Sequence, residues 1–311
     1  MNWSMSTARI FLQCQRKWYY REIYADPKSS VPDRQEAAVL SELSTIQAWR
    51  GKLVDMVISH YLVPKLNGKQ PLVKAEALKH LQELGHKQID YGRLKKYREP
   101  GGLLNRGAPE FGAFYESEYD GGPADELLQK GLDEAELSLT NLLRSDLLQK
   151  ISQDGVKCIA QRTFSLPFDG VTIHSTPDLL VFFNSGPPVI VDWKVEQPPF
   201  KDHWLQLGIY GVVLSRIKPH KDFPTGSGDA LHDPCKIDLL EYQLLRNRVS
   251  PFKIRPEDMV DIENYLHSTA TQMARTLQAL PDGDPHLIQA TWKPELCVRC
   301  NYRKICWRVS A

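Results

Sequence analysis

Apolar residues recur at two different spacings along this chain, and the change from one spacing to the other occurs near residue 155. Before that point apolar positions repeat every three or four residues, which predicts helices. A stretch rich in proline and charge, 26–34, interrupts the pattern, and Pro64 is expected to end the second helix. The helices predicted in this half are 6–24, 42–63, 71–97 and 123–151.

After residue 155 the apolar runs become short and rich in valine, isoleucine and phenylalanine, which is typical of strands. Asp169-Gly170 and the Gly-Pro-Pro segment 186–188 mark turns between them. The pattern as a whole predicts an α/β protein, with a small sheet flanked by helices and a helical N-terminal region. The predicted elements are strands at 156–168, 171–183, 189–194 and 236–246, and helices at 201–216 and 256–280.

Composition and charge narrow the class of protein. Of the 311 residues 42% are hydrophobic and 25% are charged, which is typical of a globular chain and not of a disordered one. The net charge of +1 argues against a uniformly basic nucleic-acid-binding protein but permits a local basic groove, because attraction depends on where the charges lie. No apolar stretch reaches the ~18 residues of a membrane helix, and the first residues lack the features of a secretory signal. We therefore expect a cytoplasmic protein without a membrane partner.

Two acidic residues and a lysine lie at the ends of predicted strands that are otherwise apolar. Asp178 follows a Thr-Pro pair, Asp192 follows the run 189–191, and Lys194 comes two residues later. Side chains two apart in a strand share a face, so Asp192 and Lys194 project to the same side. Charges at a buried strand end are costly unless something pairs with them. A divalent metal bound by Asp178 and Asp192 would be such a partner, with Lys194 positioning an attacking water; a structural salt bridge is the alternative.

Two polar residues share one face of the next predicted helix. Gln206 and Tyr210 are four residues apart within an otherwise apolar run. In order along the chain, Thr-Pro-Asp178, Val-Ile-Val-Asp192-Trp-Lys194 and Gln206-x-x-x-Tyr210 together resemble the PD-(D/E)XK nuclease superfamily. The resemblance is to its RecB-type branch, which carries a Q-x-x-x-Y motif. It implies that Gln206 and Tyr210 position the nucleic-acid strand.

The resemblance also implies a fold, a reaction and a role for the charged residues. The fold is a restriction-endonuclease-like core, here with 156–216 as the catalytic part, and the reaction is phosphodiester hydrolysis that depends on Mg²⁺ or Mn²⁺. Asp178, Asp192 and the backbone carbonyl of Trp193 would bind the metal. Lys194 would be the catalytic lysine.

The RecB-type branch usually contributes one further metal ligand, a histidine in a G-x-x-x-H context on an N-terminal helix. This sequence has Asp55 four residues after Gly51, and His60 comes five residues later. Five residues turn an α-helix by about 500°, or about 140° net, so Asp55 and His60 cannot easily share a face. We favour Asp55 as the third ligand because the local pattern fits and a carboxylate suits Mg²⁺ or Mn²⁺. His60 is the alternative.

The six cysteines are unevenly spaced along the chain. Cys297-x-x-Cys300-x5-Cys306 offers three thiols where a tetrahedral metal site needs four, and Cys14 is the candidate fourth. The segment around Cys14 resembles the opening helix of iron–sulfur members of the same branch, which include CRISPR-associated adaptation nucleases, AddB-type helicase–nuclease subunits and single-strand exonucleases. The resemblance implies a [4Fe–4S] cluster on these four cysteines. Zn²⁺ is the alternative, since spacing alone does not separate the two.

These assignments predict how the chain is organised. We expect a single nuclease domain, 1–311, whose ends at 1–24 and 292–311 form an iron–sulfur clasp, with 64–155 as a helical insertion. The other two cysteines, Cys158 and Cys235, lie in apolar strand-like segments and are predicted to be buried thiols.

Aromatic and basic residues cluster near both ends of the chain. Aromatic rings stack on bases and cations contact phosphates, a combination suited to single-stranded nucleic acid. The alternative is that the rings pack against the cluster while the charges are solvated. The two groups are Arg16, Lys17, Trp18, Tyr19, Tyr20 and Arg21, and Arg299, Tyr302, Arg303, Lys304, Trp307 and Arg308.

The sequence therefore predicts a metal-dependent DNA nuclease, with exonuclease activity on single-stranded ends or flaps. One alternative is a nucleic-acid-binding scaffold of the same fold that has lost catalysis, which the missing histidine favours. Another is a zinc-clasped α/β protein with a structural ion pair. The chain has no G-x-x-x-x-G-K-[ST] phosphate loop, so any unwinding would come from a partner, and helicase, CRISPR or repair proteins are the candidates.

Overall fold

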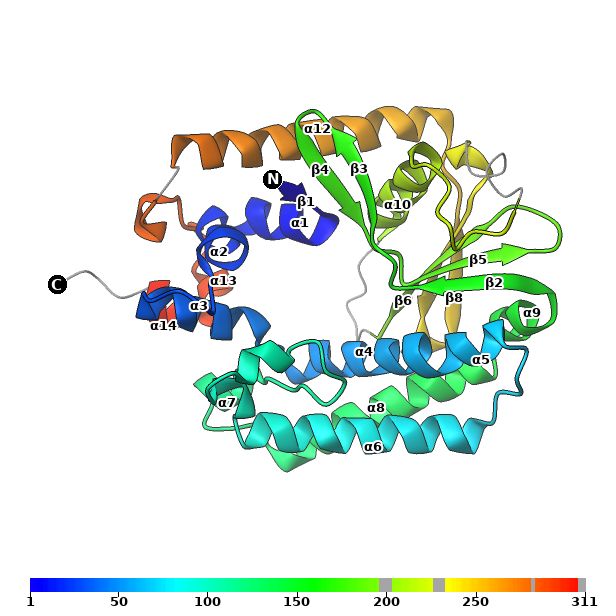
Figure 1. Ribbon diagram of the computed structural model, residues 1–311, viewed down its shortest axis with the longest axis horizontal. Helices are drawn as coiled ribbons and strands as arrows, with labels where there is room; N and C mark the ends of the chain where they lie inside the picture. The colour runs from blue at the N-terminus through cyan, green and yellow to red at the C-terminus, as the bar shows by residue number, and fades with distance from the viewer. Residues whose placement is uncertain (196–202, 226–232, 281–282, 307–311) are drawn as a thin grey trace.

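The computed structural model describes residues 1–195, 203–225, 233–280 and 283–306, and a five-stranded sheet lies at its centre (Figure 1). The strand order is β2-β5-β6-β7-β8; β6 and β7 run parallel, and the other neighbouring pairs are antiparallel. The prediction of a small sheet flanked by helices is confirmed, and the sheet is mixed, as the resemblance implies. The strands are β2 (Gly155–Ala160), β5 (Leu179–Phe183), β6 (Val189–Lys194), β7 (Asp238–Gln243) and β8 (Arg248–Phe252).

Two of the predicted strands, 156–168 and 171–183, each contain two shorter strands, because the chain leaves the main sheet and then returns to it. After β2 it forms a hairpin of β3 (Phe164–Phe168) and β4 (Val171–Ser175). The hairpin turns at Asp169 and Gly170, whose φ values of 45° and 78° suit a two-residue turn. β4 also pairs with β1 (Asn2–Trp3), so this hairpin binds the N-terminus of the chain.

Alternate side chains of the central strand β6 enter two different hydrophobic cores. Val191 and Trp193 pack with the helices drawn below the sheet in Figure 1, whereas Ile190 packs with those drawn above it. Asp192 and Lys194 share the Ile190 face and are therefore directed toward α10. The lower helices are α4 (Ile46–Val57), α6 (Lys74–Arg93), α8 (Asp125–Leu143) and α9 (Asp146–Asp154), and the upper ones are α1 (Met5–Gln13), α10 (Trp204–Arg216) and α12 (Pro256–Ala279).

The predicted helix 6–24 is interrupted at Cys14, whose backbone is extended with φ −163°. α1, capped by the Ser4 side chain, ends there, and α2 (Gln15–Tyr19) and the π-helical turn η1 (Tyr20–Tyr24) follow. The Cys14 thiol accepts a hydrogen bond from the Lys17 backbone N–H at 3.4 Å and so caps α2. The thiol also accepts from the Thr291 N–H at 3.4 Å. The interruption therefore brings Cys14 into contact with the C-terminal part of the chain.

Other helix boundaries differ from the prediction where local capping overrides the apolar pattern. Thr45 caps α4, which begins at Ile46, and the residues before it form α3 (Pro32–Glu42). Pro64 does not end the helical path, because it lies in the first turn of α5 (Val63–Asn67), where a missing N–H is tolerated. Similarly, the predicted strand 236–246 is shortened to β7 by a 3₁₀ turn at each end. The remaining described helices are η2 (Ile58–Leu62), η3 (Lys96–Arg98), η4 (Gly102–Asn105), α7 (Tyr115–Tyr119), η5 (Pro234–Lys236), η6 (Leu244–Arg246), η7 (Pro285–Leu287), α13 (Pro294–Val298) and α14 (Arg303–Cys306).

The N-terminal helices α1 and α2 lie beside the C-terminal helices α13 and α14, at the left of Figure 1. Tyr20 stacks on Tyr302 with ring centroids 5.2 Å apart, inside a third, tyrosine-rich core. Helices between residues 64 and 155 pack in one hydrophobic core with β5 and β6. The division of the chain into a helical insertion, an iron–sulfur clasp and a catalytic part stays a prediction. No helix in the described part of the chain is long and apolar enough to cross a membrane.

A buried ion pair between Arg50 and Glu134 joins α4 to α8, and Arg50 also donates to the Val195 carbonyl just beyond β6. We expect Arg50→Met to lower the free energy of unfolding by about 3 kcal/mol, because it removes the guanidinium that neutralises a largely buried carboxylate. Urea titration followed by circular dichroism measures the change. The control is Arg106→Met, whose exposed pair with Glu42 at 3.8 Å is worth less than about 1 kcal/mol. Equal losses in the two variants would contradict the prediction.

Candidate active site

The acidic residues and the lysine predicted to be catalytic meet where β6 ends beside the start of β5. Asp192 is fully buried on β6, and its carboxylate pairs with the Lys194 ammonium. Asp178 precedes β5, which runs antiparallel to β6, and its Oδ2 accepts a hydrogen bond from the Trp193 backbone N–H at 2.8 Å. The Trp193 side chain packs on the opposite face of the sheet, so only its backbone lies on the side of Asp178.

Asp55, on α4, lies at the same end of the sheet as Asp178. The Gln161 amide, just after β2, donates from Nε2 to Oδ1 of Asp55 at 2.8 Å and to Oδ1 of Asp178 at 2.9 Å. One amide therefore bridges carboxylates from two distant parts of the chain. His60 is exposed on η2. Of the two residues considered for the third ligand, Asp55 is the one that lies beside Asp178.

Two of these three carboxyl groups have raised pKa values, first because they are withdrawn from water and then because negative charges lie nearby. Burial, followed by the neighbouring carboxylates of Asp192 and Asp55, raises the pKa of Asp178 well above its usual range. Burial also raises the pKa of Asp55 to about 6, although the hydrogen bond from Gln161 opposes the rise. Because the charged forms are disfavoured, a nearby cation stabilises them. Lys194 supplies one positive charge to this cluster, and a divalent ion would supply more.

Gln206 and Tyr210 of α10 lie against the same carboxylates. Gln206 donates from Nε2 to Oδ1 of Asp192 at 3.1 Å and to the Tyr210 hydroxyl at 2.6 Å. Arg9 of α1 donates to the remaining amide atom, Oε1 of Gln206, at 3.3 Å. Burial, then Asp192 and Asp178, raise the pKa of Tyr210, so its hydroxyl keeps its proton. Gln206 thus connects α1 to the acidic end of β6.

The donor groups at this end of the sheet fit a divalent metal. Carboxylate and carbonyl oxygens are the ligands that Mg²⁺ and Mn²⁺ prefer, and the three carboxylates lie around the backbone of β6. In the described part of the chain, however, no group of three or more His, Cys, Asp or Glu side chains is arranged to hold a metal ion. The Gln161 amide and the Lys194 ammonium contact the oxygens that such an ion would use. Binding would require these two side chains to move aside.

A further buried acidic residue lies beside Asp192 on the neighbouring strand. In the parallel register of β6 and β7, Glu241 is opposite Asp192. Glu241 hydrogen-bonds with Nδ1 of His203 at 3.1 Å and with Nε2 of Gln243 at 2.7 Å. Because His203 directly precedes α10, this contact holds the start of the helix that carries Gln206. An acidic residue inside an apolar strand is a sequence signal for such a buried position, and Glu241 is not among the predicted site residues.

The four cysteines predicted to bind a cluster line one cavity of about 190 Å³. Cys14 lies between α1 and α2, and the other three lie on or beside α13 and α14. Burial raises the pKa of Cys300, and the nearby Cys14 and Cys306 add to the rise. The tertiary structure therefore brings thiols from the two ends of the chain to one place, although their arrangement is not that of a metal site.

The two remaining cysteines differ from each other. Cys158, on β2, is buried as predicted, and burial raises the pKa of its thiol to about 11. Cys235 is half-buried in the turn η5, so the prediction of a buried strand position is wrong there. The reason is the preceding Asp233-Pro234 pair: Asp233 caps a 3₁₀ turn before the strand begins.

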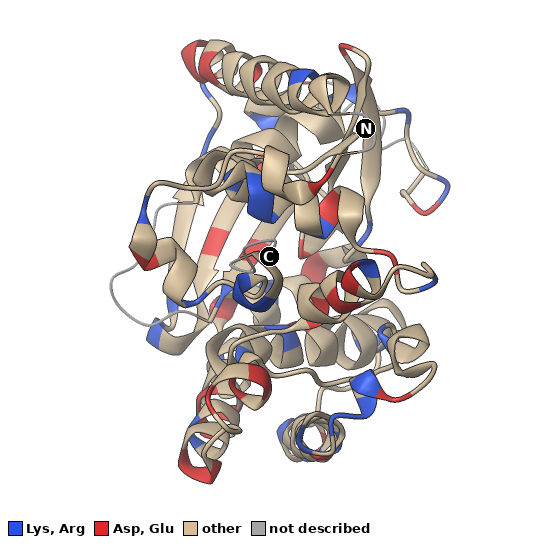
Figure 2. Cartoon of the chain, turned by 90° about the vertical axis from the view of Figure 1, so that its left-hand side faces the viewer, with Lys and Arg blue, Asp and Glu red and all other residues tan. Residues whose placement is uncertain are grey.

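The aromatic residues predicted as a base-stacking surface lie mostly inside the protein. Trp18, Tyr20 and Tyr302 are at most 2% exposed, so packing excludes these rings from contact with bases. Arg16 donates to two backbone carbonyls of the segment after α12 and has a structural role. Residues 307–308 lie outside the described residues. In the view from the left of Figure 1, basic and acidic residues are interspersed along the chain (Figure 2).

Comparison with known sequences identifies the family of this chain. The carboxylates, lysine and glutamine described above are consistent with that family. The family model of the PD-(D/E)XK nuclease superfamily matches residues 2–307, nearly the whole chain. The chain belongs to this superfamily. PD-(D/E)XK proteins are generally nucleases and typically use Mg²⁺ or Mn²⁺. The α/β architecture described above is the restriction-endonuclease-like fold of this superfamily.

Comparison with individual proteins adds less. No curated protein sequence matches the chain significantly. A solved structure titled "Crystal structure of SSO0001" is 13% identical over an alignment that covers 73% of this chain and 86% of that chain. Its TM-score is 0.28.

Two further residues that contact these carboxylates or Gln206 were not predicted from the sequence. Gln161 is the first of three polar residues after β2, and its positive φ of 49° turns its side chain between Asp55 and Asp178. Arg9 lies on α1, an amphipathic helix in which no motif sets it apart. Neither residue stands near the motifs in sequence, so only the tertiary structure reveals them.

We expect Arg9→Ala to lower kcat/KM for nucleic-acid cleavage about 10- to 100-fold, because Arg9 orients Gln206, which in turn holds the predicted metal ligand Asp192. Without Arg9 the Gln206 amide is free to rotate away from Asp192. Steady-state kinetics with Mn²⁺ measures the change, and the Mn²⁺ concentration for half-maximal rate should rise as well. Arg144→Ala, at an exposed position at the end of α8, is the control. An unchanged metal requirement in Arg9→Ala would contradict this role.

Proposed function

We propose that this protein is a metal-dependent DNA nuclease of the RecB-type branch, with exonuclease activity on single-stranded ends. The observation that carries the proposal is the meeting of carboxylates from α4, β5 and β6 at one buried point beside Lys194. Burying several carboxylates with one lysine is costly. A structural ion pair would need one acid and one base, whereas a metal site needs several acids.

Asp55, Asp178, Asp192 and the backbone carbonyl of Trp193 are the proposed ligands of Mg²⁺ or Mn²⁺. When bound, such an ion would supply Lewis-acid stabilisation of the charge that develops on the phosphate and would activate a water for attack. The raised pKa values of Asp55 and Asp178 support this assignment, because a cation would stabilise the charged forms that burial, and then the neighbouring carboxylates, disfavour.

The other residues of the site would bind and orient the DNA strand. Lys194, displaced from Asp192, would position the attacking water and stabilise negative charge on the phosphate. The protonated Tyr210 hydroxyl and the Gln206 amide would donate hydrogen bonds to the strand next to the scissile bond. Arg9 would hold Gln206 in the orientation required.

We further propose that Cys14, Cys297, Cys300 and Cys306 hold a structural [4Fe–4S] cluster that ties the two ends of the chain together. The shared cavity of about 190 Å³ supports this assignment. Zn²⁺ is the alternative and would need the four sulfurs drawn to about 2.3 Å from one point.

Purification without oxygen followed by a cleavage assay tests the proposed function. Single and double strands labelled at the 5′ or the 3′ end are incubated with Mg²⁺, with Mn²⁺ or with a chelator. We expect metal-dependent shortening of the single strands from an end, and the product lengths from the two labels give the polarity. An RNA strand of the same sequence tests the preference for DNA. Absence of cleavage with both metals would contradict the proposal.

The second candidate is a catalytically inactive scaffold of the same fold. It is supported by Asp55 in place of the usual histidine and by the engagement of the Gln206 amide with Asp192. A scaffold would bind single-stranded DNA in the same assay without shortening it, with or without metal. In either case strand separation would come from a partner such as a helicase, a CRISPR protein or a repair protein.

A further inference from the structure

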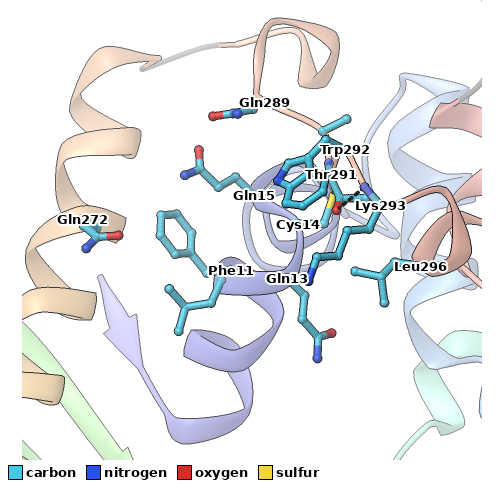
Figure 3. A pocket seen from close by; sticks show the side chains of 12 residues that line it. Phe11, Gln13, Cys14, Gln15, Gln272, Gln289, Thr291, Trp292, Lys293 and Leu296 are labelled. Atoms are coloured by element: carbon cyan, nitrogen blue, oxygen red, sulfur yellow. Dashed lines mark hydrogen bonds between the residues drawn. The ribbon is translucent and has the colours of Figure 1, made fainter.

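A pocket of about 470 Å³ lies between α1, α12 and the segment 289–293 (Figure 3). It is separate from the carboxylate cluster and adjoins the cysteine cavity at Cys14 and Thr291. Its volume is in the range of small-ligand sites, about 300–1,000 Å³. No step of the mechanism above uses it.

The lining of this pocket is rich in side-chain amides. In the described part of the chain, none of the four amide groups hydrogen-bonds to another protein group. The pocket has one lining cation, Lys293, and no lining carboxylate. Unpaired amides around a pocket offer both donors and acceptors to a ligand. The four glutamines are Gln13, Gln15, Gln272 and Gln289.

One wall of the pocket is an exposed aromatic ring. Trp292 is 81% exposed, whereas Trp3, Trp18, Trp49 and Trp193 are buried. The Lys293 ammonium lies 5.4 Å from the centroid of the Trp292 ring. The segment that carries Trp292 is held in place, because Arg16 bonds to the backbone of 286–288 and Thr291 donates to Cys14 (Figure 3). Because the backbone around the ring is held, stacking of a base on Trp292 requires little ordering of the main chain.

This combination matches an unpaired nucleotide better than a protein segment. An aromatic ring stacks on the base, amides bond to base edges, and a single cation contacts the phosphate. A protein-binding surface is instead apolar at its centre with a polar rim. Here four side-chain amides are mixed with the apolar side chains of Phe11, Leu12, Trp292 and Leu296, which suits a base with apolar faces and polar edges.

Helix α1 connects the pocket to the active site. Arg9 contacts Gln206 there, and Gln13, one turn further along the same face, lines the pocket. Four residues of helix span about 6 Å. We propose that the pocket between α1 and Trp292 is a single-strand binding subsite, in which Trp292 stacks on a base of the DNA strand whose phosphate lies at the carboxylate cluster. This inference rests on the proposed nuclease function for its substrate, but its test does not require cleavage.

Binding of a fluorescein-labelled 12-nucleotide single strand, measured by anisotropy on the full chain without added divalent metal, tests the subsite. We expect Trp292→Ala to raise Kd at least about fivefold, the lower limit for loss of one base–aromatic stack. Trp292→Phe should restore most of the affinity. A 2-aminopurine scanned along the strand should be quenched at one position by the wild type and not by Trp292→Ala. The control is Leu104→Ala, which truncates an equally exposed apolar side chain on η4.

Other outcomes overturn the subsite or separate it from the proposed function. Equal affinity of wild type and Trp292→Ala, or an equal loss in Leu104→Ala, would overturn it, and so would failure of the wild type to bind any single strand. If sedimentation shows that Trp292→Ala loses self-association and keeps its DNA affinity, the pocket is a protein contact and the inference is wrong. A wild type that binds through Trp292 but cleaves nothing with Mn²⁺ supports the subsite and overturns the nuclease.

Discussion

Replacing Asp192 with asparagine is expected to lower kcat/KM for Mn²⁺-dependent DNA cleavage by at least about 10³-fold. Asp192 contacts both Lys194 and Gln206, so its loss removes a proposed metal ligand and two contacts of the site. A metal ion supplies several kcal/mol of transition-state stabilisation, and each ~1.4 kcal/mol is a factor of ten in rate. Initial rates on a labelled single strand at saturating Mn²⁺ measure the effect.

Controls separate this catalytic loss from unfolding. Asp261→Asn, at an exposed position of α12, should retain the wild-type rate. Asp192→Asn should still bind a single strand without metal, and thermal unfolding followed by circular dichroism should show a folded protein. If Asp192→Asn proves unstable, Lys194→Met keeps the carboxylates and is expected to lower the rate about 10²- to 10³-fold. Full activity of folded Asp192→Asn would contradict the proposed metal site.

Replacing Cys14 with serine is expected to remove the visible absorbance of the proposed cluster and to lower the midpoint of thermal unfolding by roughly 6–10 °C. The cross-link closes a loop that includes nearly the whole chain, and loops of this size contribute on the order of 3–5 kcal/mol by restricting the unfolded state. For a chain of this length ~1 kcal/mol corresponds to about 2 °C. Absorbance spectra, iron analysis and thermal unfolding of anaerobically purified protein measure the two effects.

Cys235→Ser is the matched control, since Cys235 lies outside the cavity and is only half-buried. This variant should keep the colour, the iron content and the unfolding midpoint. If the wild type is colourless and contains one zinc per chain, then Zn²⁺ and not an iron–sulfur cluster links the two ends of the chain. A wild type without bound metal, or a Cys14→Ser variant as stable as Cys235→Ser, would contradict both.

Features that depend only on neighbours along the chain could be predicted from the sequence. The two-residue period of a strand puts Asp192 and Lys194 on one face, and they are in contact there. The four-residue spacing of a helix brings Gln206 to the Tyr210 hydroxyl at 2.6 Å. Likewise Asp169-Gly170 marked a turn, which is the tip of the β3–β4 hairpin. In each case the geometry of the backbone determines the relation.

Local signals also account for the errors. The apolar pattern of 6–24 continues through Cys14, but the Cys14 thiol caps a new helix and interrupts it. Pro64 was predicted to end a helix, yet the first turn of α5 tolerates it. In both places the apolar period is present, but local hydrogen bonding determines where each helix begins and ends.

The sequence by itself determined the class of fold, the ordered motif and which residues share a face within one element. Only the tertiary structure decided that Asp55 and not His60 lies beside Asp178, that Gln161 and Arg9 join the site, and that Trp292 is exposed while Trp18 is buried. Local geometry follows from bond rotations within a few residues. Contacts between distant segments depend instead on how whole helices and strands pack, and no short stretch of sequence contains that information.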